Sequence, residues 1–130
     1  MRIDAVAVTA TDMRRSIAFY AAVGFDFAGA DPAADHVEPA APEGATRLMI
    51  DSAALAERIH GRPPRPASHS GFAILCDTAD DVDARAAAVA AAGFAVVSDP
   101  WDAFWGQRYA VLEDPDGYRV DLFAPLSSGA

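Results

Sequence analysis

The chain has 130 residues, of which 52% are hydrophobic and 22% charged, and this composition is typical of one globular domain. Its net charge of −9 argues against nucleic acid and anionic membranes as partners, since both attract basic surfaces, and no apolar run approaches the ~20 residues of a membrane span. The single cysteine, Cys76, cannot form an internal disulfide, so we expect a cytoplasmic protein.

The first half of the chain predicts a strand, a helix and three more strands. An apolar strand at 3–9 precedes Asp12, which can cap a helix that ends at Gly24. The three further strands are expected at 25–28, 36–38 and 46–51. A short helix over 52–59 completes this half.

The second half repeats this order. The same number of residues separates Asp12 from Gly24 and Asp81 from Gly93, and each pair encloses a helical segment. The strands of this half are expected at 71–76, 94–97, 107–112 and 118–123. The last two are joined by a predicted four-residue turn at 114–117, and an aromatic loop is expected at 99–106.

The duplication predicts an α+β fold of two βαβββ modules in a single domain. The modules span about 1–58 and about 71–126, with a proline-rich linker at about 59–70. Together they would form one curved mixed sheet, with the helices on its convex face and a ligand cup on its concave face. The expected core beneath the helices consists of Val6, Val8, Phe72, Ile74, Tyr109, Val111, Val120 and Leu122.

Several short motifs stand out along the chain: Asp12-Met13-Arg14-Arg15-Ser16, Phe19-Tyr20, Gly24-Phe25, Trp105-Gly106-Gln107-Arg108 and Asp114-Pro115-Asp116-Gly117-Tyr118. With these motifs the chain resembles the vicinal oxygen chelate superfamily, which holds glyoxalase I, bleomycin-resistance proteins and extradiol dioxygenases. The resemblance implies a homodimer of paired modules. In the enzymes of this superfamily a divalent metal sits in the cup, with one ligand from each of four strands.

The resemblance places those four ligand positions at Ala5, Met49, Gly71 and Asp121. Only Asp121 carries a carboxylate, whereas a catalytic zinc needs three protein ligands and magnesium several oxygens. We therefore expect no metal and no cofactor. The resemblance is nearest to the metal-free members that bind antibiotics.

Three large aromatic residues lie close together in the predicted loop. Trp101, Phe104 and Trp105 would form a wall that stacks on a flat ligand. The alternative is that at least one tryptophan fills the core or the dimer seam.

Polar ligand contacts are expected from Asp121, Arg108 and Arg47. A four-residue turn places Arg108 and Arg119 on the same sheet face as Asp121, so an ion pair between them is the competing interpretation. Met49 would give the cup an apolar floor or simply pack in the core. Arg47 would contact an anionic group or remain solvated.

The histidines are dispersed along the chain. His36 would lie with Glu38 on one strand face, where it could join Asp121 in a relocated metal site or contact the ligand. His60 and His69 are expected to be exposed beside the linker. Cys76 is expected to be a buried, inert thiol.

The leading functional prediction is a metal-independent small-molecule binding protein that sequesters a planar or aromatic antibiotic or metabolite. The alternative is an enzyme: a divalent-metal-dependent lyase, isomerase or dioxygenase with non-standard ligands, or metal-free acid–base catalysis by Asp121. A third possibility is an interaction module whose aromatic loop binds another protein.

Overall fold

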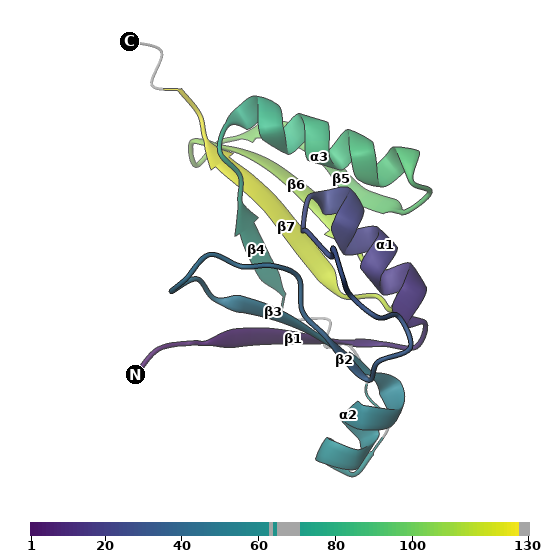
Figure 1. Ribbon diagram of the computed structural model, residues 1–130. Coiled ribbons are helices and arrows are strands. Elements are labelled where there is room, and N and C mark those ends of the chain that lie inside the picture. The colour runs from purple at the N-terminus through teal and green to yellow at the C-terminus, as the bar shows by residue number, and fades with distance from the viewer. Residues whose placement is uncertain (63, 65–70, 128–130) are drawn as a thin grey trace.

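The computed structural model describes residues 1–62, 64 and 71–127 (Figure 1). In chain order the elements are β1 (Ala5–Ala10), α1 (Met13–Val23), β2 (His36–Val37), β3 (Arg47–Ser52), α2 (Ala53–His60), β4 (Phe72–Leu75), α3 (Ala79–Ala91), β5 (Ala95–Ala103), β6 (Gln107–Glu113) and β7 (Arg119–Pro125). None of the helices in these residues has the length and apolar character needed to cross a bilayer.

The strands form a three-stranded sheet, β1-β3-β2, and a four-stranded sheet, β4-β7-β6-β5. In each sheet, the strand that comes first in the chain pairs in parallel with the strand that comes last: β1 with β3, and β4 with β7. Strand β1 therefore corresponds to β4, and β3 to β7. The α+β class and the duplication are confirmed. The sequence predicts one curved sheet, whereas the described residues form two separate sheets.

The first module lacks a counterpart of β5. Residues 25–28, predicted as a strand, are irregular and end in a turn. The Asp26 carboxylate accepts a hydrogen bond from the Ala28 backbone N–H (2.9 Å), and the Ala30 N–H donates to the Phe27 carbonyl. Such local bonds compete with strand pairing, because they occupy backbone groups that a neighbouring strand would need.

Each helix begins at a residue whose side-chain oxygen accepts a backbone N–H. Asp12 accepts from Arg15 at the start of α1, and Ser52 accepts from Leu55 at the start of α2. Helix α3 begins slightly before its predicted start, because Thr78 accepts the N–H of Asp81. These bonds stabilise helix starts by satisfying donors that have no partner within the helix.

Helices α1 and α3 lie side by side over one face of the sheets (Figure 1). The core between these helices and the sheets contains the largest fully buried apolar side chains: Tyr20, Phe19, Ile50, Leu112, Leu122, Val8, Val23, Val82, Val89 and Val120. Of the predicted core, Val8, Val120 and Leu122 are buried, and Val6, Phe72 and Ile74 are half-buried. Cys76 is buried in the same cluster, and burial raises the pKa of its thiol, as expected for an inert cysteine.

The prediction for Tyr109 and Val111 was wrong, because strand β6 faces the opposite way. Glu113 pairs with Arg119, so the connecting loop spans 114–118 and is one residue longer than predicted. One extra residue turns every side chain of a strand to the other face. Tyr109 and Val111 therefore point away from the helices, and Arg108 points toward them.

The longer loop is held by a buried carboxylate. Asp114 accepts hydrogen bonds from the backbone of Asp116 and Tyr118 and from the Tyr20 hydroxyl of α1 (2.8 Å). Burial raises the pKa of Asp114. Burial, and then the neighbouring Asp114 carboxylate, raise the pKa of Tyr20 far above its usual value. The Thr11 hydroxyl also donates to Asp116 (2.7 Å), so this loop ties the second module to the first.

Candidate ligand-binding site

Four aromatic side chains share the face of the second sheet that points away from α1 and α3. Trp101 of β5 pairs with Tyr109 of β6, and Tyr109 pairs with Phe123 of β7, so these rings form a row across three strands. Trp105, from the β5–β6 turn, packs edge-on against Trp101 (5.5 Å between centroids) and Tyr109 (5.3 Å). We call Trp101, Trp105, Tyr109 and Phe123 the aromatic face.

The aromatic face is open to solvent. Trp101 is 41% exposed and Trp105 48%, and Phe104 at the tip of the hairpin is 91% exposed. Phe104 touches only the edge of this group, through an edge-to-face contact with Trp105 (4.9 Å). Contiguous exposed apolar surface of this kind usually marks an interaction site.

Trp101 lies on a strand and not in the predicted loop. Strand β5 continues to Ala103, and its register shifts twice before Trp101. Such bulges accommodate a residue like Pro100, which cannot donate a hydrogen bond to a regular ladder. Because Trp101 is held by strand pairing, its position is fixed by the sheet.

Asp121 of β7 lies next to the aromatic face and is bonded to it. Its carboxylate accepts a hydrogen bond from the Tyr109 hydroxyl. Burial, and then this bond to Asp121, raise the pKa of Tyr109 to about 12, so the hydroxyl stays protonated at neutral pH. The strand neighbours of Asp121 are small or medium-sized, Ala73 on β4 and Val111 on β6.

Neither Arg108 nor Arg119 forms the predicted ion pair with Asp121. Arg119 shares the face of Asp121, but its guanidinium lies 3.9 Å from Glu113. Arg108 lies on the opposite face, where it bonds Asp83 of α3 (2.9 Å) and Asp102 of β5 (3.0 Å). Arg108 therefore fastens the β5–β6 hairpin to α3 and does not adjoin Asp121.

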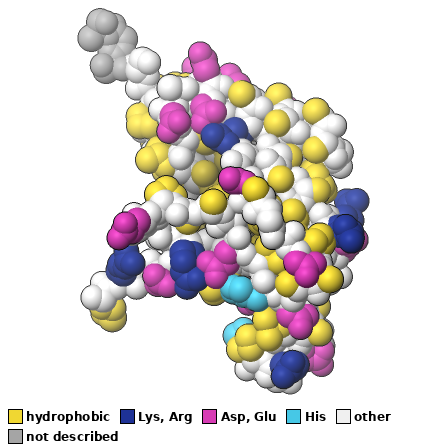
Figure 2. Space-filling view, viewed as in Figure 1, with side chains coloured by type: hydrophobic (Ala, Val, Ile, Leu, Met, Phe, Trp, Pro, Cys, Tyr) yellow, Lys and Arg dark blue, Asp and Glu magenta, His cyan; other side chains and the backbone are white. Residues whose placement is uncertain are grey.

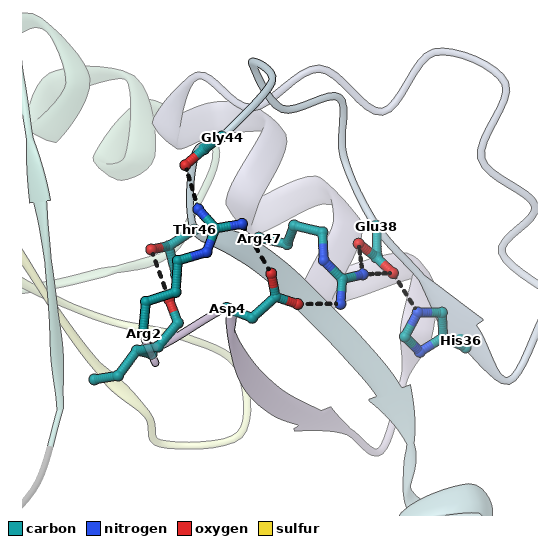
Figure 3. A network of polar contacts seen from close by, with 8 residues as sticks. Arg2, Asp4, His36, Glu38, Gly44, Thr46 and Arg47 are labelled. Atoms are coloured by element: carbon teal, nitrogen blue, oxygen red, sulfur yellow. Dashed lines mark hydrogen bonds and ion pairs between the residues drawn. The ribbon is translucent and has the colours of Figure 1, made fainter.

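The first sheet presents a charged network on its face opposite the core (Figure 3). The ring of His36 bonds Asp51 through Nδ1 (2.6 Å) and Glu38 through Nε2 (2.7 Å). Arg47 donates to Glu38 (2.7 Å) and to Asp4 (2.9 Å). In Figure 2 basic and acidic side chains alternate along this part of the molecule, next to a histidine.

This network engages two residues predicted to contact a ligand. The bonds to Glu38 and Asp51 raise the pKa of His36, and the bond from His36 lowers the pKa of Glu38. A protonated His36 uses both ring N–H groups as donors and has no lone pair for a metal. Arg47 is neutralised by two carboxylates, which leaves it poorly placed to bind an anionic group.

The donor set does not fit the divalent metal that the resemblance implies. The strand register pairs Ala7 with Met49 and Ala73 with Asp121, so Met49 and Asp121 occupy equivalent places in the two sheets. Met49, half-buried on β3, is no ligand for a hard cation, and Ala5 and Gly71 have no side-chain donor atoms. Within residues 1–62, 64 and 71–127, no three His, Cys, Asp or Glu side chains gather to hold a metal ion.

The larger hollows of the described residues lie elsewhere on the molecule. A groove of about 500 Å³ runs between β4 and the first sheet, and its walls include Val6, Leu48, Phe72 and the predicted ligand residue Arg47. A wider hollow of about 860 Å³ is lined by Thr9, Asp51, Tyr118 and His60, among others. His60 is exposed as predicted, and His69 lies outside the described residues.

Some of the residues predicted from the sequence to contact a ligand lie together on or beside the aromatic face, and their role in binding stays a prediction. They are Trp101, Phe104, Trp105 and Asp121, whereas Tyr109 and Phe123 were missed because the loop length set the wrong face for β6. The signal available in the sequence was Asp114, whose carboxylate can accept backbone N–H groups further along the loop and so lengthen it.

The chain belongs to the Glyoxalase/Bleomycin resistance protein/Dioxygenase superfamily, whose family model matches residues 2–122. No curated protein matches it. A glyoxalase-related enzyme from Fulvimarina pelagi has a similar structure with a TM-score of 0.80 at 16% identity, over 98% of this chain and 93% of that one.

Two other solved structures show the same fold. A family enzyme from Burkholderia phytofirmans PsJN gives a TM-score of 0.76 at 18% identity, covering 97% of this chain and all (100%) of that one. A lactoylglutathione lyase from Agrobacterium tumefaciens gives a TM-score of 0.67 at 20% identity, covering 95% of this chain and 92% of that one. These likenesses establish the fold and leave the reaction open.

Proposed function

We propose that this protein binds small, flat aromatic molecules without a metal and sequesters them, as a homodimer in the cytoplasm. The observation that carries the proposal is the aromatic face, where two half-exposed tryptophans stand over a row of rings beside Asp121. An antibiotic or an aromatic metabolite would be a ligand of the right shape.

Aromatic rings at the protein surface cost free energy that a bound ligand would recover. A large apolar side chain that stays at the protein surface does not gain the free energy of burial, which is about 1.5–3 kcal/mol. A flat ligand stacked on one of the two tryptophans, with the perpendicular ring of the other at its edge, would recover part of that free energy. Each favourable ring contact adds about 0.5–1.5 kcal/mol beyond the area that it buries.

Intrinsic fluorescence provides a direct test, because the chain has two tryptophans and both belong to the aromatic face. Planar antibiotics and simple fused-ring compounds would be titrated while tryptophan emission is recorded. We expect saturable quenching, and we expect Trp105→Leu to weaken binding about tenfold. Phe27→Leu, far from this face in the sequence, serves as a control for changes in overall stability.

The proposal fails if no planar compound gives saturable quenching, or if Trp105→Leu binds as tightly as the natural chain. Metal analysis of protein purified without chelators addresses the enzyme alternative. A stoichiometric divalent ion that survives dialysis would contradict metal-independent binding and favour a lyase, isomerase or dioxygenase with relocated ligands.

A further inference from the structure

The carboxylate of Asp121 is only partly satisfied. Its Oδ2 atom accepts the Tyr109 hydroxyl, and Oδ1 accepts no donor from the described residues. No arginine or histidine of the described part of the chain forms an ion pair with it. No side-chain oxygen of the described residues is both buried and without a partner, so Oδ1 is accessible from solvent and free to meet a cationic ligand.

The rings beside Asp121 also favour positive charge. Trp105 stands nearly perpendicular to Trp101 (89°) and to Tyr109 (79°), so the ring faces turn in different directions. The face of an aromatic ring is electron-rich and attracts cations, tryptophan most strongly. Ring faces and carboxylate therefore attract the same kind of ligand.

Two polar hydrogens at this face are already used within the protein. The Tyr109 hydroxyl donates to Asp121, and the Trp105 indole N–H donates to Gln107 (2.8 Å). Among the described residues of the second sheet, Arg119 is the cation on this face, and Glu113 lies opposite it on β6. The two carboxylates, Glu113 and Asp121, outnumber that arginine, in a chain of net charge −9.

From this juxtaposition of Asp121 with the aromatic face we infer that the ligand carries a positive charge. The preferred molecule is a flat organic cation, such as a quaternary or protonated aromatic amine, stacked on one tryptophan with its charge toward Asp121. This inference rests on the proposed function, because it names the chemical class of ligand for the same site.

The test compares three bicyclic probes of similar size by isothermal titration calorimetry at about pH 7.5, where quinoline is neutral. The probes are N-methylquinolinium, quinoline and 2-naphthoate: a permanent cation, a neutral molecule and an anion. We expect the cation to bind about tenfold more tightly than quinoline and the anion most weakly. Raising the salt concentration from about 0.05 to 0.5 M should narrow this difference.

Variants of the carboxylate assign the preference to Asp121. Asp121→Asn should reduce the preference for the cation to about threefold, and Asp121→Glu should retain it. Asp99→Asn removes the same charge from an exposed position on β5 and should leave the preference unchanged. The Asp121→Glu variant keeps the test decisive if Asp121→Asn folds poorly.

The outcomes separate the two proposals. Equal binding of N-methylquinolinium and quinoline, or an unchanged preference in a folded Asp121→Asn variant, overturns the inference and leaves the proposed function standing. If none of the three probes binds, the proposed function fails as well.

Discussion

The hydroxyl of Tyr20, in the middle of α1, donates a 2.8 Å hydrogen bond to the buried carboxylate of Asp114 in the β6–β7 loop. Asp114 also accepts two backbone N–H groups of its own loop. One carboxylate thus sets the length of the loop and attaches it to the opposite module. Because that length fixes which side chains of β6 join the aromatic face, the site depends on a bond that lies outside it.

Removing this hydroxyl should destabilise the fold. We expect Tyr20→Phe to lower the free energy of unfolding by about 1–3 kcal/mol, since it leaves a buried acceptor short of one partner. Urea denaturation followed by circular dichroism measures the change. Tyr118→Phe is the control, because its hydroxyl bonds no described residue, and a change under about 0.5 kcal/mol is expected. Equal stabilities of the two variants would contradict the role assigned to Asp114.

Glycine at position 24 is required by both conformation and space. Gly24 ends α1 with φ of 129°, and a Cβ there would lie 1.6 Å from Nη1 of Arg85. That guanidinium donates to the Val23 carbonyl (2.5 Å), so moving it would cost a hydrogen bond at the end of the helix. We expect Gly24→Ala to lower the free energy of unfolding by about 1–3 kcal/mol.

Gly29 provides the matched control for this substitution. Its φ of 79° is also positive, but a Cβ there would meet no atom within 4 Å. Gly29→Ala should therefore cost less, about 1 kcal/mol. If thermal and urea denaturation find Gly29→Ala at least as destabilising as Gly24→Ala, the overlap with Arg85 is not what makes glycine necessary.

The charged network around His36 should make stability depend on pH. Glu38 and Asp51 raise the folded-state pKa of His36 above its ordinary value of 6.5. A raised pKa means that the network's stabilisation is fully present below about pH 6.5 and is lost as the pH rises through the folded-state pKa. His36→Gln should therefore be less stable than the natural chain at acidic pH and converge with it at alkaline pH.

Urea denaturation between about pH 5.5 and 9 measures this difference. His60→Gln, at the exposed end of α2, is the control and should parallel the natural chain throughout. A difference between His36→Gln and the natural chain that does not change with pH would show that the ring acts by packing and not by its charge.

The exposed ring of Phe104 allows the proposed dimer to be tested apart from folding. Because Phe104 is 91% exposed, Phe104→Ser should change the free energy of unfolding by less than about 0.5 kcal/mol. If the hairpin tip lies in a dimer interface, the same change should weaken the dimer, which sedimentation velocity would detect. A monomeric natural chain would contradict the dimer itself.

The helices could be predicted from the sequence because their signals are local. Asp12 and Ser52 each accept a nearby backbone N–H, and Gly24 ends α1. The repeated spacing from Asp12 to Gly24 and from Asp81 to Gly93 added the second, longer-range signal. These features were sufficient for the α+β class and the module duplication.

The faces of the strands could not be predicted so directly, because they depend on loop geometry. The hydrogen bonds of Asp114 lengthen the β6–β7 loop by one residue, which moves Tyr109 to the aromatic face and Arg108 to the other side. The side-chain bond of Asp26 likewise replaces a predicted strand. In each case a single carboxylate decided a structure that hydrophobic alternation alone left open.

The guanidinium of Arg85 joins the two repeats at a place far from the aromatic face. It is anchored to Asp81 within α3 (2.9 Å) while it donates to the last residue of α1. Neither repeat can therefore melt without breaking a contact of the other. For all its internal duplication, the molecule should behave thermodynamically as one cooperative unit, with a single calorimetric transition in place of two.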